Sequence, residues 1–249
     1  MYNKINVALF VQSRILSDEI LKKISKKKKF LNIFLVCSDI DFKKKLKKIY
    51  FSDFNWVKNN KNNKKKIIDL INKYKLKSLY AFSIQHKWIV PKEIIDKFKY
   101  FVNFHYGDIP KYRGHHPIIH AILNNEKNIF GTVHLIDEKL DKGSIIDKVK
   151  IPNNKISSLN AEKKLSSEFA DYFEKLINKF VNKKKINIKK NIKVNGKFYS
   201  IKEIKKLKEV KNFSEVLTKT YAFEYPPHEP AYIKIGSNKI YLSTNNLNK

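Results

Sequence analysis

The sequence contains little cysteine, little arginine and no long apolar run. Its 249 residues include one cysteine, Cys37, which excludes a disulfide framework and a metal site built from cysteines. No apolar stretch approaches the roughly 20 residues that a membrane-spanning helix needs. Residues 1–10 also lack the apolar core and cleavage site of a signal peptide. We therefore expect a cytoplasmic protein without a membrane partner.

Arginine is scarce although the chain is strongly basic. Lys+Arg is 53 and Asp+Glu is 23, a formal net charge of +30, yet Arg14 and Arg113 are the two arginines of the sequence. Proteins that read nucleic acid rely on the arginine fork to bind bases and phosphates. Nucleic acid is therefore not expected to be the main partner. An anionic small substrate fits the charge equally well.

Short apolar runs alternate with amphipathic stretches in the first part of the chain. The runs predict strands at 5–11, 31–37, 79–82 and 101–104, and the stretches between them predict helices at 13–25, 42–50, 65–74 and 92–98. Strands separated by helices indicate a parallel sheet with crossover helices. We expect an open, mostly parallel α/β sheet that binds its ligand at the carboxyl ends of its strands.

In the second part of the chain, the composition and the apolar pattern change near residue 185. Before that point the pattern predicts a helix at 117–123, strands at 129–136 and 144–149, and a long helix at 157–180. After it comes a basic stretch, and residues 231–242 form a hairpin pattern around a glycine turn. We expect a catalytic domain at 1–185 and a small, β-rich C-terminal region at 186–249 that ends in this hairpin.

Polar side chains suited to catalysis gather around residue 105. Asn103 and His105 lie two apart at the end of a predicted strand, so their side chains share one face. A carboxamide donor beside an imidazole can stabilise a developing oxyanion and transfer a proton. Further along, Thr132 and His134 share another strand face, and Asp141 lies in a loop from which its carboxylate can orient a histidine.

Taken together, residues 103–146 resemble the formyltransferases that use 10-formyltetrahydrofolate. The family motifs are Asn-x-His, Pro-x-Tyr/Trp-Arg-Gly-x-x-Pro, Thr-x-His and Asp-x-Gly-x-Ile, which correspond here to 103–105, 110–117, 132–134 and 141–145. The resemblance extends over residues 1–180 and implies a Rossmann-like formyltransferase sheet. The departures are Gly107, Asp108 and Ile109, where the family often has Ser, Leu and Leu, and the direct adjacency of Gly131 and Thr132.

The resemblance also implies roles for individual residues. It gives Asn103, His105 and Asp141 as the catalytic set, with Thr132 and His134 as supports and no metal. It further implies that the pterin of 10-formyltetrahydrofolate binds against Ser83, Gln85, His86, Trp88, Ile89, Ile136 and Asp137.

Two further segments limit the class of molecule that can accept the formyl group. Residues 10–14 contain no glycine, whereas the related glycinamide ribonucleotide enzymes carry a glycine-rich phosphate loop at that place. Residues 196–232 resemble the C-terminal region of sugar N-formyltransferases, several of which dimerise through C-terminal hairpins. This implies a homodimer and a nucleotide-linked amino sugar, with dTDP-4-amino-4,6-dideoxyglucose for surface polysaccharide (O-antigen) as the best guess. The expected substrate-binding residues are Arg14, Lys111, Tyr112, Arg113 and Gly114.

Three alternatives remain open at this point. A methionyl-tRNA formyltransferase with a reduced C-terminal domain agrees with the lysine excess, although the region after 185 is short for its barrel. A metal site could use His116 and His120, four apart on a predicted helix, but no Glu follows His116 and no Cys is near. A non-catalytic binding module would make the grouping of Asn103, His105 and Asp141 coincidental.

Overall fold

The computed structural model describes residues 4–12, 14–37, 44, 55–58, 64–73, 79–86, 89–189 and 196–246. These residues form two compact units, each assembled from three segments of the chain. The first unit takes its residues from 1–105, 133–147 and 166–191, and the second from 106–132, 148–165 and 192–249. Each unit contains a hydrophobic core of its own.

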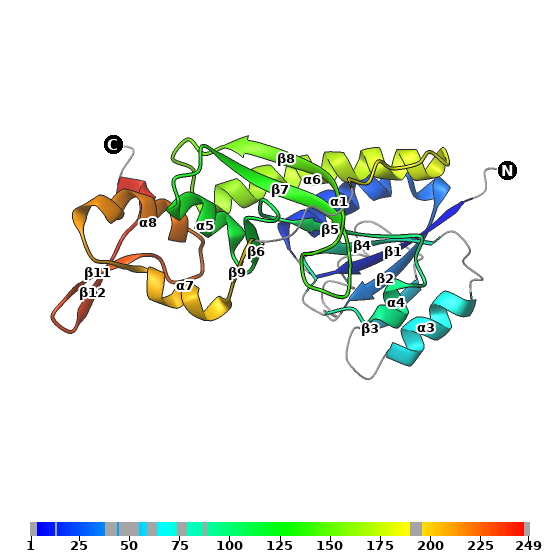
Figure 1. Ribbon diagram of the computed structural model, residues 1–249, viewed down its shortest axis with the longest axis horizontal. Coiled ribbons are helices and arrows are strands. Elements are labelled where there is room, and N and C mark those ends of the chain that lie inside the picture. Colours follow the sequence, from blue (N-terminus) through cyan, green and yellow to red (C-terminus); the bar gives the residue numbers. More distant parts are fainter. Residues whose placement is uncertain are drawn as a thin grey trace. The chain divides into compact units, whose positions relative to one another are not determined.

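A seven-stranded sheet runs through the described residues in the order β3-β2-β1-β4-β5-β7-β8. Its strands are β1 (Ile5–Val11), β2 (Leu31–Cys37), β3 (Asn55–Lys58), β4 (Leu79–Ile84), β5 (Tyr100–His105), β7 (Asn128–Leu135) and β8 (Ile145–Pro152). Each neighbouring pair from β3 to β5 is parallel. Figure 1 shows β1, β2 and β4 side by side. The expected, mainly parallel α/β sheet is therefore confirmed.

Helices connect or follow these strands much as the apolar spacing predicts. They are α1 (Ile15–Ser25), the 3-10 helix η1 (Lys28–Phe30), α3 (Lys64–Lys73), α4 (Lys92–Ile95) and α6 (Ser158–Val181). The helix α4 ends before the expected residue 98, because the amides of Lys97 and Phe98 bond three residues back and tighten the last turn. The helix expected at 42–50 lies, apart from Lys44, outside the described residues.

Aromatic side chains join the middle of the sheet to α6 in the first unit. The rings of Phe82 and Phe173 are 4.6 Å apart, and those of Phe104 and Phe169 are 5.3 Å apart. Side chains alternate along a strand, so Phe104 packs against α6 while Asn103 and His105 lie on the opposite face of β5. The same alternation thus fixes the core and presents the catalytic candidates.

The second unit combines short strands with short helices. Its further elements are β6 (Tyr112–Gly114), α5 (Pro117–Leu123), β9 (Lys197–Tyr199), α7 (Ile201–Leu207), β10 (Glu209–Val210), η3 (Phe213–Glu215), α8 (Val216–Phe223), β11 (Tyr232–Ile235), β12 (Asn238–Tyr241) and η4 (Thr244–Asn246). The strands β11 and β12 pair antiparallel around Gly236, which confirms the predicted hairpin. The helices α7 and α8 add helical structure to a region for which the sequence suggested mainly strands.

Neither compact unit is one continuous stretch of the chain. The boundary expected near 185 lies close to the last division, between residues 191 and 192. The earlier divisions fall inside β7, β8 and α6, because each of these elements continues from one unit into the other. A change in local composition marks a boundary between segments, so it cannot reveal a unit boundary that lies inside a continuous strand or helix. No helix among the described residues has the length and apolarity to cross a bilayer.

Candidate active site

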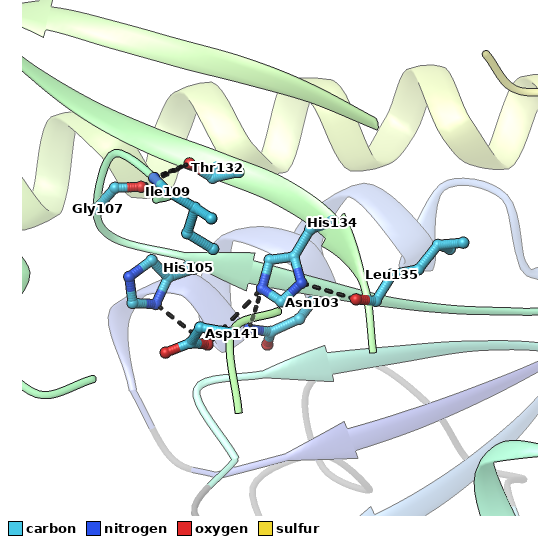
Figure 2. Close-up of polar contacts among 8 residues, drawn as sticks. All are labelled: Asn103, His105, Gly107, Ile109, Thr132, His134, Leu135 and Asp141. Atoms are coloured by element: carbon cyan, nitrogen blue, oxygen red, sulfur yellow. Dashed lines mark hydrogen bonds and ion pairs between the residues drawn. The ribbon is translucent and has the colours of Figure 1, made fainter. Parts of the chain in front are cut away.

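Four polar side chains of the first unit converge where β5 ends. Asn103 and His105 come from β5, His134 comes from β7, and Asp141 comes from residues 136–144, which we call the Asp141 loop. Figure 2 shows the four side chains pointing toward one another. His105 and Asp141 are each 7% exposed and His134 is 2% exposed. The grouping of Asn103, His105 and Asp141 expected from the sequence is therefore present.

Asp141 lies between two imidazole rings. Its Oδ1 is 3.6 Å from Nδ1 of His105 and 3.8 Å from Nε2 of His134. Because Nδ1 of His105 faces the carboxylate, Nε2 lies on the other side of the ring. A carboxylate in this position orients the imidazole.

His134 is held as a neutral imidazole of one tautomer. Its Nδ1 lies 2.7 Å from the carbonyl oxygen of Leu135, and since a carbonyl oxygen can only accept, Nδ1 carries the hydrogen. Burial lowers the pKa of His134 to about 4, although the negative charge of Asp141 acts in the opposite direction. The unprotonated Nε2 is then left as a hydrogen-bond acceptor.

The neutral His134 fixes the carboxamide of Asn103. Nδ2 of Asn103 lies 3.1 Å from Nε2 of His134 and donates to it. This bond turns the amide nitrogen toward His134 and uses one of its two hydrogens. The second hydrogen is the one that can donate to a ligand. His134 therefore orients the side chain of Asn103, and its supporting role in catalysis stays a prediction.

The backbone of the Asp141 loop explains why its sequence contains Asp-x-Gly. Asp141 has φ of 53°, a left-handed conformation that Asp tolerates better than most residues. Two residues later, a Cβ at position 143 would overlap the carbonyl oxygen of Leu135, so that position accommodates only glycine. The amide of Leu135 in turn donates to the carbonyl of Ser144 at 2.9 Å. The loop is thus closed by its own backbone.

The segment after His105, residues 106–111, is held by side chains from other elements; we call it the His105 loop. The Thr132 hydroxyl donates to the carbonyl of Gly107 at 2.6 Å and accepts from the amide of Ile109 at 3.1 Å (Figure 2). Lys148 forms an ion pair with Asp108. Thr132 is fully buried, so both hydrogen bonds are shielded from water. Thr132 therefore holds this loop, and its supporting role in catalysis stays a prediction.

Residues expected to bind the pterin lie mainly at the carboxyl end of β4. Ser83 is buried near the end of that strand, Gln85 follows with φ of 52°, and the His86 ring packs edge-on against Phe10 at 5.7 Å. Ile89 is exposed. The others are Ile136 and Asp137, which begin the Asp141 loop, and Trp88, which lies outside the described residues. Contact of this group with the pterin stays a prediction.

The expected substrate-binding residues lie in two places. Arg14 precedes the first residue of α1 and so marks the carboxyl end of β1 in the first unit. The other four lie in the second unit and include β6. There the hydroxyl of Tyr112 donates to Glu126 at 2.6 Å and accepts from Asn124 at 2.9 Å, and Lys111 pairs with Glu126.

Arg113 is nine-tenths buried, and its Nη2 donates to the carbonyl of Gly196. Within the part of the chain that the structure describes, its Nε has no hydrogen-bond partner and no carboxylate pairs with the guanidinium. Gly114 has φ of 88°. Substrate contact by Lys111, Tyr112, Arg113 and Gly114 stays a prediction. Glu126 and Gly196, the partners of these side chains, were not anticipated, because no local pattern marks a contact between distant segments.

The sequence profile of the formyl transferase domain matches residues 4–177. The chain belongs to the formyl transferase family. Methionyl-tRNA formyltransferases of Finegoldia magna and Campylobacter lari are 31% and 32% identical to it over 121 and 165 residues, which are 47% and 64% of this chain. These matches span 38% and 51% of the two relatives, so the chain covers less than two thirds of their length.

Solved structures match this family member over nearly its whole length. A 4-N formyltransferase from Francisella tularensis has a TM-score of 0.76 and 24% identity, over 98% of both chains. A sugar N-formyltransferase from Shewanella sp. has a TM-score of 0.74 and 17% identity, over 96% of both chains. An N-formyltransferase from Helicobacter canadensis, solved with folinic acid and dTDP-3-aminofucose, has a TM-score of 0.69 and 23% identity, over 96% of this chain and 86% of that one. The fold and the family expected from the motifs are confirmed.

Proposed function

We propose that this protein transfers a formyl group from 10-formyltetrahydrofolate to the amine of a nucleotide-linked amino sugar. The observation that carries formyl transfer is the cluster of Asn103, His105, His134 and Asp141 in a family member. The best candidate acceptor is dTDP-4-amino-4,6-dideoxyglucose, whose formylated product serves surface polysaccharide. A cytoplasmic location belongs to this proposal, because charged folates and nucleotide sugars do not cross a bilayer unaided.

The chemistry uses the cluster as follows. The amine attacks the formyl carbon of the donor, and negative charge develops on the formyl oxygen. The second hydrogen of Asn103 Nδ2 donates to that oxygen, and a hydrogen-bond donor so placed lowers the barrier by several kcal/mol in other enzymes. His105 adds a second donor when protonated, or accepts the proton of the amine as a general base. The bond between the formyl carbon and N10 of the folate then breaks, N10 takes up a proton from His105, and tetrahydrofolate leaves. Asp141 orients the imidazole and assists this proton transfer.

The choice of acceptor is supported by the extent of the structural likeness. The Francisella tularensis and Shewanella enzymes align with 98% and 96% of this chain, so residues after the family profile are included. The named ligand of the Helicobacter canadensis enzyme is a dTDP-linked amino sugar. The curated methionyl-tRNA formyltransferases match at most about half of their own length here. Together with the charge of +30, those relatives keep initiator tRNA as the second candidate.

Charge also favours an anionic acceptor. A buried guanidinium without a carboxylate partner is costly, because its charge loses water and gains no counter-charge. Arg113 is in this situation within the described residues. A diphosphate would supply the missing negative charge and fits the planar donor fork of arginine. In the first unit, Arg14, which precedes α1 at the end of β1, is the cation that we assign to anion binding.

A homodimer through the C-terminal hairpin is part of the proposal. All four residues of β12 are exposed, and β12 is the outer strand of the order β10-β11-β12. Ile235, Ile240 and Tyr241 are each at least half exposed. An open, apolar strand edge of this kind favours pairing with a second copy. Light scattering of the purified protein and of Ile240→Lys tests it: a dimer that this change converts to a monomer supports the assignment.

The decisive experiment is a turnover assay with 10-formyltetrahydrofolate and a panel of amino-sugar nucleotides, followed by the mass of the product. A gain of one formyl group on one panel member identifies class and acceptor together. Formylation of charged initiator tRNA without any sugar turnover contradicts the proposal. Arg14→Ala is expected to raise the Michaelis constant for the sugar nucleotide several-fold and to leave kcat unchanged. An unchanged constant removes Arg14 from the site.

A further inference from the structure

We propose that β9, a strand beyond the family profile, is a positioning element for the His105 loop and hence for formyl transfer. The profile ends at residue 177, whereas β9 comprises Lys197–Tyr199. In the second unit β9 pairs in parallel with β6, with Tyr112 opposite Lys197 and Gly114 opposite Tyr199. The strand β6 directly follows the His105 loop. Three groups of contacts hold β9 in this place.

The first contact lies at the beginning of β9. A Cβ at position 196 would overlap the carbonyl oxygen of Pro110, so Gly196 packs directly on the backbone of the His105 loop. The guanidinium of Arg113 donates to the carbonyl of Gly196 from the neighbouring strand. Any larger residue at position 196 would break this contact, unless the backbone at 196 or the backbone at Pro110 moves.

The second contact lies at the end of β9. The carbonyl of Tyr199 accepts a hydrogen bond from the amide of His115 at 2.9 Å. Gly114 has φ of 88°, and an added Cβ there would lie 2.5 Å from the same carbonyl oxygen. A glycine therefore lies at each end of β9: Gly196 directly precedes it, and Gly114 of β6 lies opposite its last residue.

The third contact is aromatic and buries the pair. The ring of Tyr199 stacks on His120 of α5 at 3.8 Å and on Tyr112 at 5.8 Å. Burial lowers the pKa of His120 to about 4, with the positive charge of Lys197 as a smaller cause, so the stacked imidazole is neutral at pH 7. The Tyr199 ring thus lies against both α5 and the strand that follows the His105 loop.

These contacts place one support of the His105 loop outside the recognised domain. Thr132 and Lys148, which hold the loop by side-chain contacts, lie among the residues 4–177 that match the family profile. The strand β9, which packs against the same loop, lies after these residues. If β9 leaves this position, Pro110 loses its contact with Gly196, and the backbone just after His105 changes its path. Positioning errors of this kind reduce the rate of the chemical step more than they reduce ligand binding.

The test compares two glycine-to-alanine changes in the full-length protein. Gly196→Ala introduces the overlap with Pro110. Gly236→Ala, the control, adds backbone strain at the turn of the hairpin, where φ is 59°, but its Cβ lies in open space and contacts neither β9 nor the His105 loop. We expect Gly196→Ala to lower kcat at least tenfold, to leave the dissociation constant for 5-formyltetrahydrofolate within twofold, and to accelerate hydrogen exchange of the His115 amide. Gly236→Ala is expected to change none of these readouts by more than twofold.

The outcomes separate this inference from the acceptor assignment, on which only the kcat measurement rests. Ring-nitrogen resonances of His105, the His115 exchange rate and binding of 5-formyltetrahydrofolate need no acceptor. A folded Gly196→Ala protein with unchanged His105 resonances and unchanged kcat overturns the inference, whichever acceptor is used. If Gly196→Ala does not fold, Tyr199→Leu removes the stacking without adding bulk. A shift of the His105 ring-nitrogen resonances and a loss of kcat are then expected, as for Gly196→Ala, and their absence likewise overturns the inference.

Discussion

The Asp141 loop of the first unit and the His105 loop of the second unit are held in different ways. The Asp141 loop is closed by its own backbone, through the left-handed Asp141 and the glycine at 143. The His105 loop is fastened by side chains, chiefly the Thr132 hydroxyl and the ion pair between Asp108 and Lys148. A loop fixed by its backbone is sensitive to an added Cβ, whereas a loop fixed by side chains is sensitive to lost polar groups.

The largest effect is expected at the catalytic candidates of the first unit. His105→Ala and Asp141→Asn should each lower kcat by about 10²- to 10⁴-fold, because each removes a group that transfers or steadies a proton. Near-ultraviolet circular dichroism should show an intact fold. Glu138→Gln, an exposed carboxylate in the same loop, is the control and should stay within twofold. Wild-type turnover in either variant would contradict the assignment of the site.

The second prediction breaks the Asp141 loop through its backbone. In Gly143→Ala the new Cβ meets the carbonyl of Leu135, so the loop must shift and carry Asp141 with it. We expect kcat to fall at least tenfold and the free energy of unfolding to fall by about 1–3 kcal/mol, as in other overpacked sites. Lys142→Ala, one residue earlier, should change neither quantity appreciably. Equal behaviour of the two variants would show that the backbone does not fix this loop.

The third prediction concerns His134, whose Nδ1 donates to the same carbonyl of Leu135. Its pKa is lowered from 6.5 to about 4, so below pH 6.5 the unfolded chain binds a proton that the folded protein refuses. Stability is therefore full above pH 6.5 and falls as the pH drops toward 4, by up to about 3 kcal/mol from this residue. Urea unfolding at several pH values measures the slope.

The variant His134→Leu should flatten that slope, and His115→Leu, at an exposed position, should leave it unchanged. The slope that remains in His134→Leu is expected from His120, whose pKa is also lowered to about 4 by burial. His134→Leu should in addition lower kcat, because Asn103 loses the acceptor that orients its amide. An undiminished pH slope in this variant would be inconsistent with a buried, neutral His134.

The smallest effect is expected where the His105 loop loses one side-chain contact. Thr132→Val keeps the shape of the side chain but leaves the carbonyl of Gly107 and the amide of Ile109 without their partner. We expect a loss of about 1–3 kcal/mol in the free energy of unfolding and a several-fold decrease in kcat. Thr132→Ser retains the hydroxyl and should preserve most of both. If Thr132→Val is as active and as stable as Thr132→Ser, the Thr132 hydroxyl does not hold the His105 loop, and the proposed difference between the two loops is wrong.

Much of the fold was predictable because it follows from local apolar spacing. The strands β1 and β2 and the helix α5 lie at or near their predicted bounds, since seven or more patterned residues define each of them. The strands β3, β6 and β9 escaped prediction, because three or four residues carry no readable period. The length of α4 was also overestimated, because the bonds that end a helix are not visible in its apolar pattern.

The sequence by itself determined the catalytic candidates and the family, because Asn103, His105 and Asp141 occur in motifs whose spacing is local. Only the tertiary structure decided how these groups are held. The tautomer of His134 depends on burial, and its contact with Asn103 joins two strands that are distant in sequence. The bond between Arg113 and Gly196 spans 83 positions. Local spacing limits which side chains can share a face, but contacts between distant segments form only when packing brings those segments together.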